Sequence, residues 1–548
     1  MGLCNNFIIF ADKFKLILNY IIMKKTIKLL MLLASILPFL TSCSEDDNVS
    51  PEPVNVAEYT ILYYANGGSN VDRCILSMLK DFYEADDDAY KKVNVVVQYK
   101  FSTVDNLKKQ REDYSDSYAS HFTDAYNQYF GSKTVRWAVD PTKTLEEQMK
   151  SPATLYGEDN ADCTCPDSLT NFINWAAKTY PAKKYILVMN DHGHGYRPDE
   201  DLPDVTDIRG MIFDDGYLLP DGSKKHFTVK NFTRAIRSAN VRFETIYLLA
   251  CLMNNLEYLY EMRNLCDYII AATYTMPATG GALGDLVEQF AKPSVDVEKA
   301  LSAYCEADVK SWDEAWEITE NNPIYTDLTV SRTAAFDALG PVMKEFTDRL
   351  CNTYQNGTEE QKQKIDECTE EAVKMHMDNP YYDCAKYMTN IMLKLPEVYD
   401  NNFCERLEDT FNNTIVSQHR SKYLEAHDYQ VDYSIILGVE GTYSVLKWKE
   451  DENGNMILQK RTRYCADGNT YVSNYTFQGD DNYQETQAQL STPWGSTLAD
   501  TFEQLEFDRA VGWSRWIKLN RKEPSLFCPE GLNFVLPDGD ASINPSLQ

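Results

Sequence analysis

One apolar stretch, Glu244–Glu257, constrains the fold of this chain more than any other. Its β-prone run from Ile246 to Leu249 stops at Ala250-Cys251, and a segment with helical spacing follows. Such a run is typical of a strand buried on both faces of an α/β sheet. Residues at the carboxyl end of such a strand face the binding crevice, where Cys251 could act as a nucleophile. A structural buried cysteine gives the same pattern, and the stretch alone does not decide between the two.

Other parts of the chain alternate between strand-like and helix-like segments. Runs rich in β-branched and aromatic residues cover 59–64, 93–99 and 185–189, and segments with helical spacing cover 71–83 and 166–179. Strands that alternate with helices predict βαβ units and a largely parallel sheet. The predicted fold class is therefore α/β.

The overall charge restricts the kind of partner. The 548 residues carry a formal net charge of −30 at pH 7, and 43% of them are hydrophobic. This hydrophobic content is that of a globular protein, and the length predicts two or more domains. Nucleic-acid binding needs clustered Lys and Arg, so the charge argues against a nucleic-acid partner. An acidic surface mainly favours solubility, and a preference for cationic substrates is the weaker interpretation.

The amino-terminal region has the features of an export signal. A basic start at Met23 precedes an apolar run from Leu29 to Leu40, and Cys43 follows. The run is too short for a permanent transmembrane helix. Its end resembles the lipobox of bacterial lipoproteins, in which the cysteine is acylated and becomes the first mature residue. The resemblance implies a signal region over 1–43, with its true start at Met23.

The segment after Cys43 is expected to be a tether. Residues 44–57 are acidic at first and then contain two prolines, and they resemble the tethers of surface-exported lipoproteins. The resemblance implies a lipid anchor to the membrane through Cys43. We therefore expect an outer-membrane lipoprotein of the cell envelope that faces the periplasm or the cell surface.

A catalytic cysteine needs a base, and one histidine is placed to supply it. A neighbouring histidine lowers the pKa of a thiol and carries its proton to the leaving group. Of the seven histidines, His192 alone directly follows a strong apolar strand and precedes a glycine. If its strand is a parallel neighbour of the Cys251 strand, both side chains reach one crevice. The N–H groups of Gly193 and Cys251 could then form an oxyanion hole.

These motifs resemble those of the clostripain family of cysteine peptidases, in the caspase-like clan. Tyr185–Tyr196 (YILVMNDHGHGY) is similar to the family's Asp-His-Gly-x-Gly-aromatic motif, and Ala250–Met253 (ACLM) is similar to its Ala-Cys-Leu-Met motif. His192 precedes Cys251 by 251 − 192 = 59 residues, which agrees with the order and spacing of that clan.

The resemblance implies an αβα sandwich with caspase-like topology over 58–345, and cysteine endopeptidase activity on protein or peptide substrates. It assigns His192 as general base and acid, and Cys251 as the nucleophile that forms a thioacyl-enzyme. It assigns the main-chain N–H groups of Gly193 and Cys251 as oxyanion donors. Some members of the family mature by internal cleavage or use calcium, and we expect no other cofactor.

Two departures from the family pattern concern specificity. The family typically cleaves after arginine or lysine, and its Asp two positions before the nucleophile is Leu249 here. Where the family often has paired acids, this chain has Thr273 and Tyr274. A buried cation without a carboxylate partner is strongly disfavoured. Leu249, Thr273 and Tyr274 are thus candidates for the substrate pocket. They predict a neutral or apolar first-site residue, with the basic preference left open.

The surroundings of His192 carry three further expectations. Asp191 fits a structural role at the strand end at least as well as catalytic orientation, and His194 is expected to be a loop residue without a role. The loop Arg197–Arg209 is long and polar, which suggests a nicking site or a lid. The Asp-rich run 199–207 is a weak candidate for calcium.

The chain beyond residue 345 is expected to form two further regions. Residues 346–430 have mainly helical patterns, and 431–548 are predicted to be β-rich. Asn453-Gly454 lies between two alternating runs and predicts a hairpin.

Two other functions are compatible with the pattern. One is an inactive or weakly active surface lipoprotein that binds peptide or glycan. The altered pocket residues favour it, and the retained His192 and Cys251 argue against it. The other is a metal site of Cys163, Cys165, His192 and His194. Their Cys-x-Cys and His-x-His spacings are not those of structural zinc sites, so we predict no metal.

Overall fold

A computed structural model of the chain describes a set of ranges that begins at Val56. The ranges are 56–67, 71–101, 133–149, 156–159, 162–198, 208–218, 224–277, 281–315, 326–371, 381–426, 435–438, 443–450, 456–464, 470–471, 488–490 and 503–520. Contacts divide the chain into Met1–Asn55 and Val56–Gln548. The predicted signal region, Cys43 and all but the end of the tether lie outside the described ranges.

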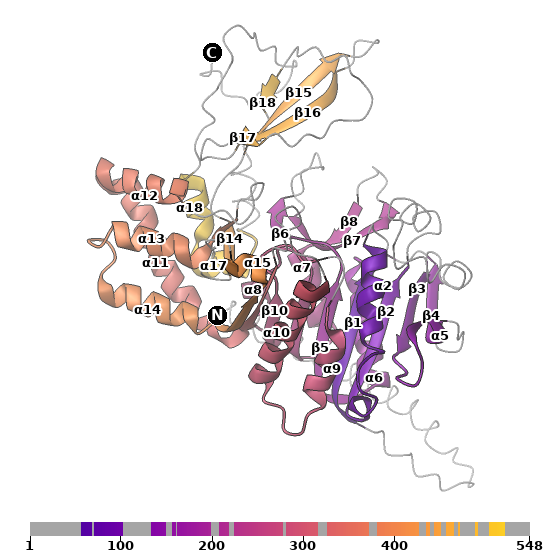
Figure 1. The fold of residues 1–548 in the computed structure, drawn as a ribbon. Helices are drawn as coiled ribbons and strands as arrows, with labels where there is room; N and C mark the ends of the chain where they lie inside the picture. Colours follow the sequence, from indigo (N-terminus) through magenta and orange to yellow (C-terminus); the bar gives the residue numbers. More distant parts are fainter. Residues whose placement is uncertain are drawn as a thin grey trace, which may run out of the picture. The chain divides into compact units, whose positions relative to one another are not determined.

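A nine-stranded sheet forms the centre of the described part (Figure 1). Its order is β13-β11-β10-β9-β5-β1-β2-β3-β4. The strands are β1 (Ala57–Asn66), β2 (Val93–Lys100), β3 (Lys133–Ala138), β4 (Tyr156–Asp159), β5 (Ala182–Asn190), β9 (Phe243–Leu249), β10 (Cys266–Ala271), β11 (Asp327–Arg332) and β13 (Ile415–Arg420).

The five central strands, β2-β1-β5-β9-β10, are parallel, and the strands outside them are antiparallel. The chain passes from β1 to β2 on one side and later places β5 on the other side of β1. The carboxyl ends of β1 and β5 therefore flank a topological switch point, where open α/β sheets bind their ligands. The predicted α/β fold with a mostly parallel sheet is confirmed.

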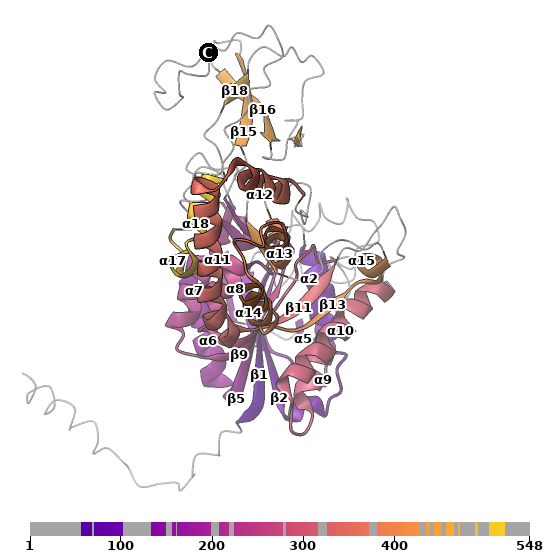
Figure 2. The same ribbon diagram turned by 90° about the vertical axis from the view of Figure 1, so that its left-hand side faces the viewer.

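Helices cover both faces of the sheet. One face packs against α6, α7, α8 and α11, and the other against α2, α9 and α10 (Figure 2). Side chains of β9 alternate between the two cores: Ile246 and Leu248 face the first, whereas Tyr247 and Leu249 face the second. The strand is apolar throughout because both of its faces are buried. The helices are α2 (Asp72–Asp81), α5 (Leu145–Met149), α6 (Pro166–Thr179), α7 (Val229–Ser238), α8 (Leu256–Met262), α9 (Leu283–Ala291), α10 (Val297–Ala315), α11 (Phe336–Asn356), α12 (Glu359–Glu371), α13 (Cys384–Lys394), α14 (Asn401–Asn412), α15 (Lys422–Ala426), α17 (Glu506–Val511) and α18 (Trp513–Leu519).

Local sequence signals set the starts of the helices around the sheet. Pro166 occupies the first turn of α6, where its missing N–H costs nothing. The Thr228 hydroxyl accepts from Asn231 N–H at 3.1 Å and caps α7. The Asn255 side chain accepts from Tyr258 N–H at 3.1 Å and caps α8. α8 therefore starts only a few residues after Cys251, as the helical spacing there predicts.

Three smaller sheets complete the described part. β6 (Gly193–Pro198), β7 (Ile208–Leu218) and β8 (Lys224–Phe227) form one sheet, which begins directly after His192. β12 (Tyr381–Asp383) pairs with β14 (Ile436–Gly438). The last contains β17 (Thr470–Tyr471), β16 (Met456–Tyr464), β15 (Tyr443–Glu450) and β18 (Ala488–Leu490). The two strands predicted around Asn453-Gly454 are antiparallel partners, and the turn residues lie outside the described ranges.

Segments beyond residue 345 belong to the same core as the sheet. β13, from the region predicted as helical, forms an edge of the central sheet against β11. α17 and α18, from the region predicted as β-rich, pack against α8 and α11 through Phe507 and Trp516. The predicted boundaries near 345 and 430 thus do not coincide with edges of the hydrophobic core. No helix in the described ranges is long and apolar enough to cross a membrane.

Candidate active site

Both candidate catalytic residues follow strands that end at one edge of the sheet. β5 and β9 are parallel neighbours, with Asn190 opposite Leu249 at their carboxyl ends. His192 and Cys251 each come two residues after that pair. The structure therefore places them at adjacent strand ends, as the sequence motifs require.

The main chain of Gly193 lies directly against that of Cys251. A Cβ atom on Gly193 would come within 2.3 Å of the Cys251 carbonyl oxygen and 3.0 Å of its nitrogen. It would also lie 2.9 Å from the Cβ of Ala250. No side chain fits into this space, so glycine allows the histidine loop to approach the cysteine. His192 and Cys251 are both half-buried beside this contact.

Cys251 lies on a tight turn between β9 and α8, and the segment after β10 holds this turn. Leu252 has a φ of +61°, a left-handed conformation that costs a non-glycine residue about 1–2 kcal/mol. Its N–H donates to the carbonyl oxygen of Tyr274 at 3.0 Å, and Asn254 N–H donates to that of Ala272 at 2.9 Å. Strained residues of this kind persist only where the surroundings fix them, and they cluster at active sites.

The histidine loop is held from the other side by β7. Ile212 N–H donates to the carbonyl oxygen of His192 at 3.1 Å, and Ile212 is left-handed, with a φ of 58°. One oxygen of Asp191 accepts from Phe213 N–H at 2.8 Å and from the Asn66 side chain at 3.1 Å. These bonds tie the carboxyl ends of β1 and β5 to the middle of β7. They agree with the structural role expected for Asp191.

The Cys251 sulfur has a main-chain donor. Met276 N–H points to it, with nitrogen and sulfur 3.2 Å apart. Burial raises the pKa of the Cys251 thiol above its ordinary value, and the Met276 N–H acts in the opposite direction. A hydrogen bond to the charged form favours the thiolate, so Met276 partly offsets the cost of burial.

Comparison with known proteins decides the family. The sequence profile of the clostripain family matches residues 64–494, which is most of the chain. The chain belongs to the clostripain family. It is therefore a cysteine peptidase, as the motifs around His192 and Cys251 predict.

Several solved structures are similar to this clostripain-family peptidase at low identity. A secreted C11 cysteine protease from Bacteroides thetaiotaomicron is 13% identical, with 84% of this chain and 100% of that chain covered and a TM-score of 0.49. A secreted C11 cysteine protease from the same organism, in complex with an irreversible peptide inhibitor, is 15% identical, with 83% and 99% covered and a TM-score of 0.48. An inactive zymogen C11 protease from Parabacteroides distasonis is 14% identical, with 83% and 98% covered and a TM-score of 0.47. A search of curated proteins found no match.

The three candidate pocket residues of this clostripain-family peptidase are buried. Leu249 is 4% exposed, Tyr274 is 5% exposed and Thr273 is fully buried. The Thr273 hydroxyl accepts from the Asn254 side chain at 3.1 Å, and the N–H groups of Thr273 and Tyr274 both donate to Asp327. Sequence reasoning missed Asp327. Its only local signal is an acid at the start of a short strand in which Leu328 and Val330 alternate with polar residues.

A buried ion pair joins the end of β2 to β7, and sequence reasoning missed it as well. Lys100 and Asp214 are 2% and 0% exposed, and their charged atoms are 2.6 Å apart. Asp214 also accepts from the Cys163 N–H at 3.2 Å and from its thiol at 3.1 Å. Cys163 therefore pairs with a carboxylate that the metal hypothesis did not include. No group of three or more metal-ligating side chains occurs within the described ranges, and the His194 side chain lies outside them.

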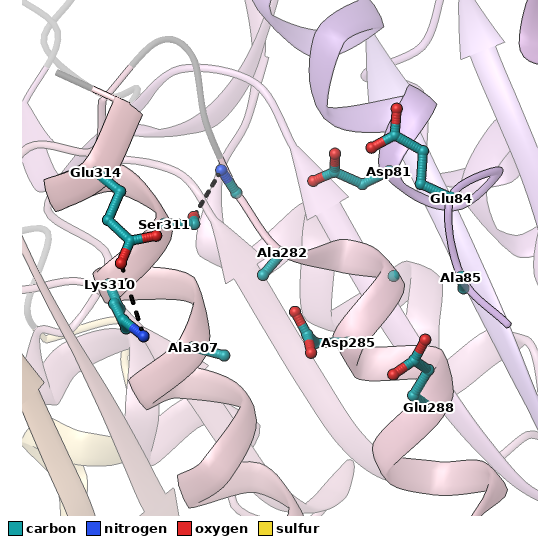
Figure 3. Close-up of a pocket in the computed structure, with 12 residues that line it drawn as sticks. Asp81, Glu84, Ala85, Ala282, Asp285, Glu288, Ala307, Lys310, Ser311 and Glu314 are labelled. Atoms are coloured by element: carbon teal, nitrogen blue, oxygen red, sulfur yellow. Dashed lines mark hydrogen bonds and ion pairs between the residues drawn. The ribbon is translucent and has the colours of Figure 1, made fainter.

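A separate acidic pocket of about 440 Å³ lies between α2, α9 and α10 (Figure 3). Lys310 lines it as well, 3.6 Å from Glu314. Burial raises the pKa of Asp81 to about 7, with repulsion from Glu84 and Asp308 adding to the shift. The run predicted as a weak calcium site, 199–207, lies outside the described ranges. The acidic lining consists of Asp81, Glu84, Asp285, Glu288 and Glu314.

Proposed function

We propose that the protein is a cysteine endopeptidase in which His192 is the general base and acid and Cys251 is the nucleophile. The observation that carries the proposal is the contact of Gly193 with the main chain of Cys251. This contact brings the histidine loop to the turn that bears the thiol, at the carboxyl edge of parallel β5 and β9. Caspase-like topology is part of the proposal and is supported by this arrangement.

The reaction follows from these positions. His192 takes the thiol proton, and the Cys251 sulfur attacks the carbonyl carbon of the scissile peptide bond. The N–H groups of Gly193 and Cys251 donate to the oxygen that becomes negative. His192 then gives its proton to the departing amine, which leaves a thioester on Cys251. His192 next deprotonates a water molecule, whose oxygen attacks the thioester carbonyl and releases the acid and the free thiol.

The first-site residue of the substrate is proposed to be neutral or apolar. Leu249 supplies a hydrocarbon side chain where a carboxylate would be needed to pair with arginine or lysine. An unpaired cation in such a pocket loses its hydration without a partner. A neutral side chain does not incur this cost.

A panel of reporter peptides with arginine, lysine, leucine or tyrosine before the cleaved bond tests both the mechanism and the first-site preference. We expect turnover of the leucyl or tyrosyl peptide, none with Cys251→Ala, and a loss of about 10²–10⁴-fold with His192→Ala. A clear preference for arginine would refute the apolar pocket but not the peptidase mechanism. Full turnover by Cys251→Ala would refute the peptidase mechanism.

A binding protein of the same fold is the second candidate function. The raised thiol pKa of Cys251 and the buried pocket candidates favour it. In that case no reporter peptide is cleaved, although peptide or glycan still binds the folded protein.

The proposal also places the peptidase in the cell envelope as a lipoprotein anchored through Cys43. The order of basic start, apolar run and cysteine in residues 1–43 supports it. We expect the protein in the membrane fraction of cells and a Cys43→Ala variant in the soluble fraction. The same distribution of wild type and Cys43→Ala between the membrane and soluble fractions would refute the anchor.

Maturation by self-cleavage is proposed for the connection between β6 and β7, within Arg197–Arg209. This connection follows His192 closely in the chain. Incubation of active protein should give two fragments, and Cys251→Ala should stay intact. A single chain in both samples would refute cleavage there.

A further inference from the structure

We propose that Asp327 is a positioning residue that sets the nucleophile turn through the main chain of residues 272–276. The inference rests on the proposed role of Cys251 as the nucleophile. Asp327 is the first residue of β11 and is fully buried. It lies 327 − 251 = 76 residues after Cys251 in the chain, so only the fold connects the two.

The Asp327 side chain accepts main-chain hydrogen bonds just beyond the point where the pairing of β10 and β11 ends. Ala271 and Thr329 are the last paired residues of the two strands. Beyond them, the N–H groups of Thr273 and Tyr274 both donate to Asp327 Oδ1, at 2.9 and 3.0 Å. Buried N–H groups need an acceptor, and bonds to a carboxylate are stronger than bonds to a neutral oxygen. Asp327 therefore fixes two consecutive peptide units.

The segment fixed by Asp327 in turn holds the nucleophile turn. Every second residue of 272–276 makes a main-chain contact with that turn: Ala272 accepts from Asn254 N–H at 2.9 Å, Tyr274 accepts from Leu252 N–H at 3.0 Å, and Met276 N–H donates to the Cys251 sulfur at 3.2 Å. The Asn254 side chain adds a fourth bond, to the Thr273 hydroxyl, at 3.1 Å. A shift of this segment therefore moves the cysteine as well.

The turn needs such support because Leu252 is left-handed. Its φ of +61° is unfavourable for a side chain with a Cβ atom. The Tyr274 carbonyl oxygen that accepts the Leu252 N–H belongs to the same residue whose N–H donates to Asp327. Without Asp327, we expect the main chain at Tyr274 to turn and the strained conformation of Leu252 to relax. A displacement of about 1 Å at a reacting atom can lower the rate about 10²-fold.

Three variants separate the position of the acceptor oxygen from its charge. Asp327→Asn keeps an oxygen where Oδ1 accepts both N–H bonds, but it removes the charge. Asp327→Glu keeps the charge and moves the oxygen by one methylene, about 1.5 Å. Asp327→Ala removes the acceptor. We expect kcat on the preferred reporter peptide to stay within about fivefold for Asn, and to fall by about 10²-fold for Glu and Ala.

Asp308→Ala is the matched control. Asp308 is a buried carboxylate of α10 that accepts from Ala282 N–H at 2.7 Å and from the hydroxyls of Tyr247 and Tyr304 at 2.9 and 2.8 Å. Its loss should lower the melting temperature as Asp327→Ala does, with a much smaller loss of kcat. If Asp327→Ala does not fold, the Asn and Glu variants still decide the question.

Two outcomes would overturn the positioning role. One is equal loss of kcat in Asp327→Ala and Asp308→Ala at equal melting temperature. The other is an Asp327→Asn variant as inactive as Asp327→Glu, because charge would then matter more than the position of the acceptor. Turnover by Cys251→Ala in the same assay would instead refute the proposed function, so the two failures are distinguishable.

Discussion

Gly193 is the residue of the candidate site with the least space for change. In Gly193→Ala, the new Cβ would meet the Cys251 carbonyl oxygen at 2.3 Å, so one of the two loops must move. We expect kcat/KM to fall by about 10²-fold or more. Gly284→Ala is a control, because its Cβ would meet the Asp81 carbonyl oxygen at 2.7 Å away from the thiol. Steady-state kinetics of both variants check this, and a fully active Gly193→Ala would contradict the proposed contact.

Lys100 provides a second prediction for a single residue. Lys100→Met leaves Asp214 buried without its cation, and breaking such a pair costs about 3–5 kcal/mol. The double variant Lys100→Met/Asp214→Leu removes both charges and should recover part of that loss. Urea unfolding of wild type and variants measures it. Equal unfolding free energies for the single and double variants would contradict this role of the ion pair.

Sequence reasoning at the scale of residues reached His192, Gly193 and Cys251, because strand ends and glycines are local signals. It could not reach Asp327 or the Lys100–Asp214 pair. Their partners lie 53 to 114 positions away in the chain, and only the sheet order brings them together. Local composition gives no sign of which buried charge has a partner.

At the scale of elements, α18, the last helix of the described residues, is an integral part of the core. Trp516 is fully buried and meets the Tyr354 ring of α11 edge-on at 5.3 Å. We expect Trp516→Ala to lower the free energy of unfolding by about 3–5 kcal/mol. Arg515→Ala on the same helix breaks an exposed ion pair with Asp348 and an exposed bond to the Gly512 carbonyl oxygen, and should cost about 1 kcal/mol or less. Similar losses of unfolding free energy for Trp516→Ala and Arg515→Ala, measured by urea unfolding, would contradict this packing.

Periodicity predicted the helices near the sheet, such as α2 and α6, but not the joining of distant segments. The helical region of 346–430 contributes β13 to the sheet edge. α17 and α18 lie within 431–548, which was predicted to be β-rich. An edge strand and a docked helix look the same in sequence whether they pack on this core or on another. Tertiary packing decides this, and local pattern does not record it.

At the scale of the whole molecule, buried carboxyl groups predict an acidic optimum of stability. Burial raises the pKa of Asp81 to about 7, and that of Asp308 and Asp327 to about 6. These values lie above the pKa of an unfolded aspartate, about 3.9. The native state therefore binds more protons than the unfolded state between about pH 4 and 7, so stability falls as the pH rises through this window. The net charge of −30 acts in the same direction.

Urea unfolding at pH 5 and pH 7 checks this prediction. We expect the larger free energy of unfolding at pH 5 and a smaller difference in Asp308→Asn, which cannot ionise. A free energy that rises from pH 5 to pH 7 would contradict it.

The proposed mechanism depends on Cys251 as the nucleophile and on His192 as the group that activates it. The most direct measurement is peptide mapping by mass spectrometry after the full chain reacts with a peptidyl acyloxymethyl ketone, which alkylates an activated thiol. We expect one adduct, on Cys251 and on no other cysteine, and a rate of labelling that falls at least about 10²-fold in His192→Ala. Labelling of a different cysteine, or equal labelling of Cys251 with and without His192, would contradict it.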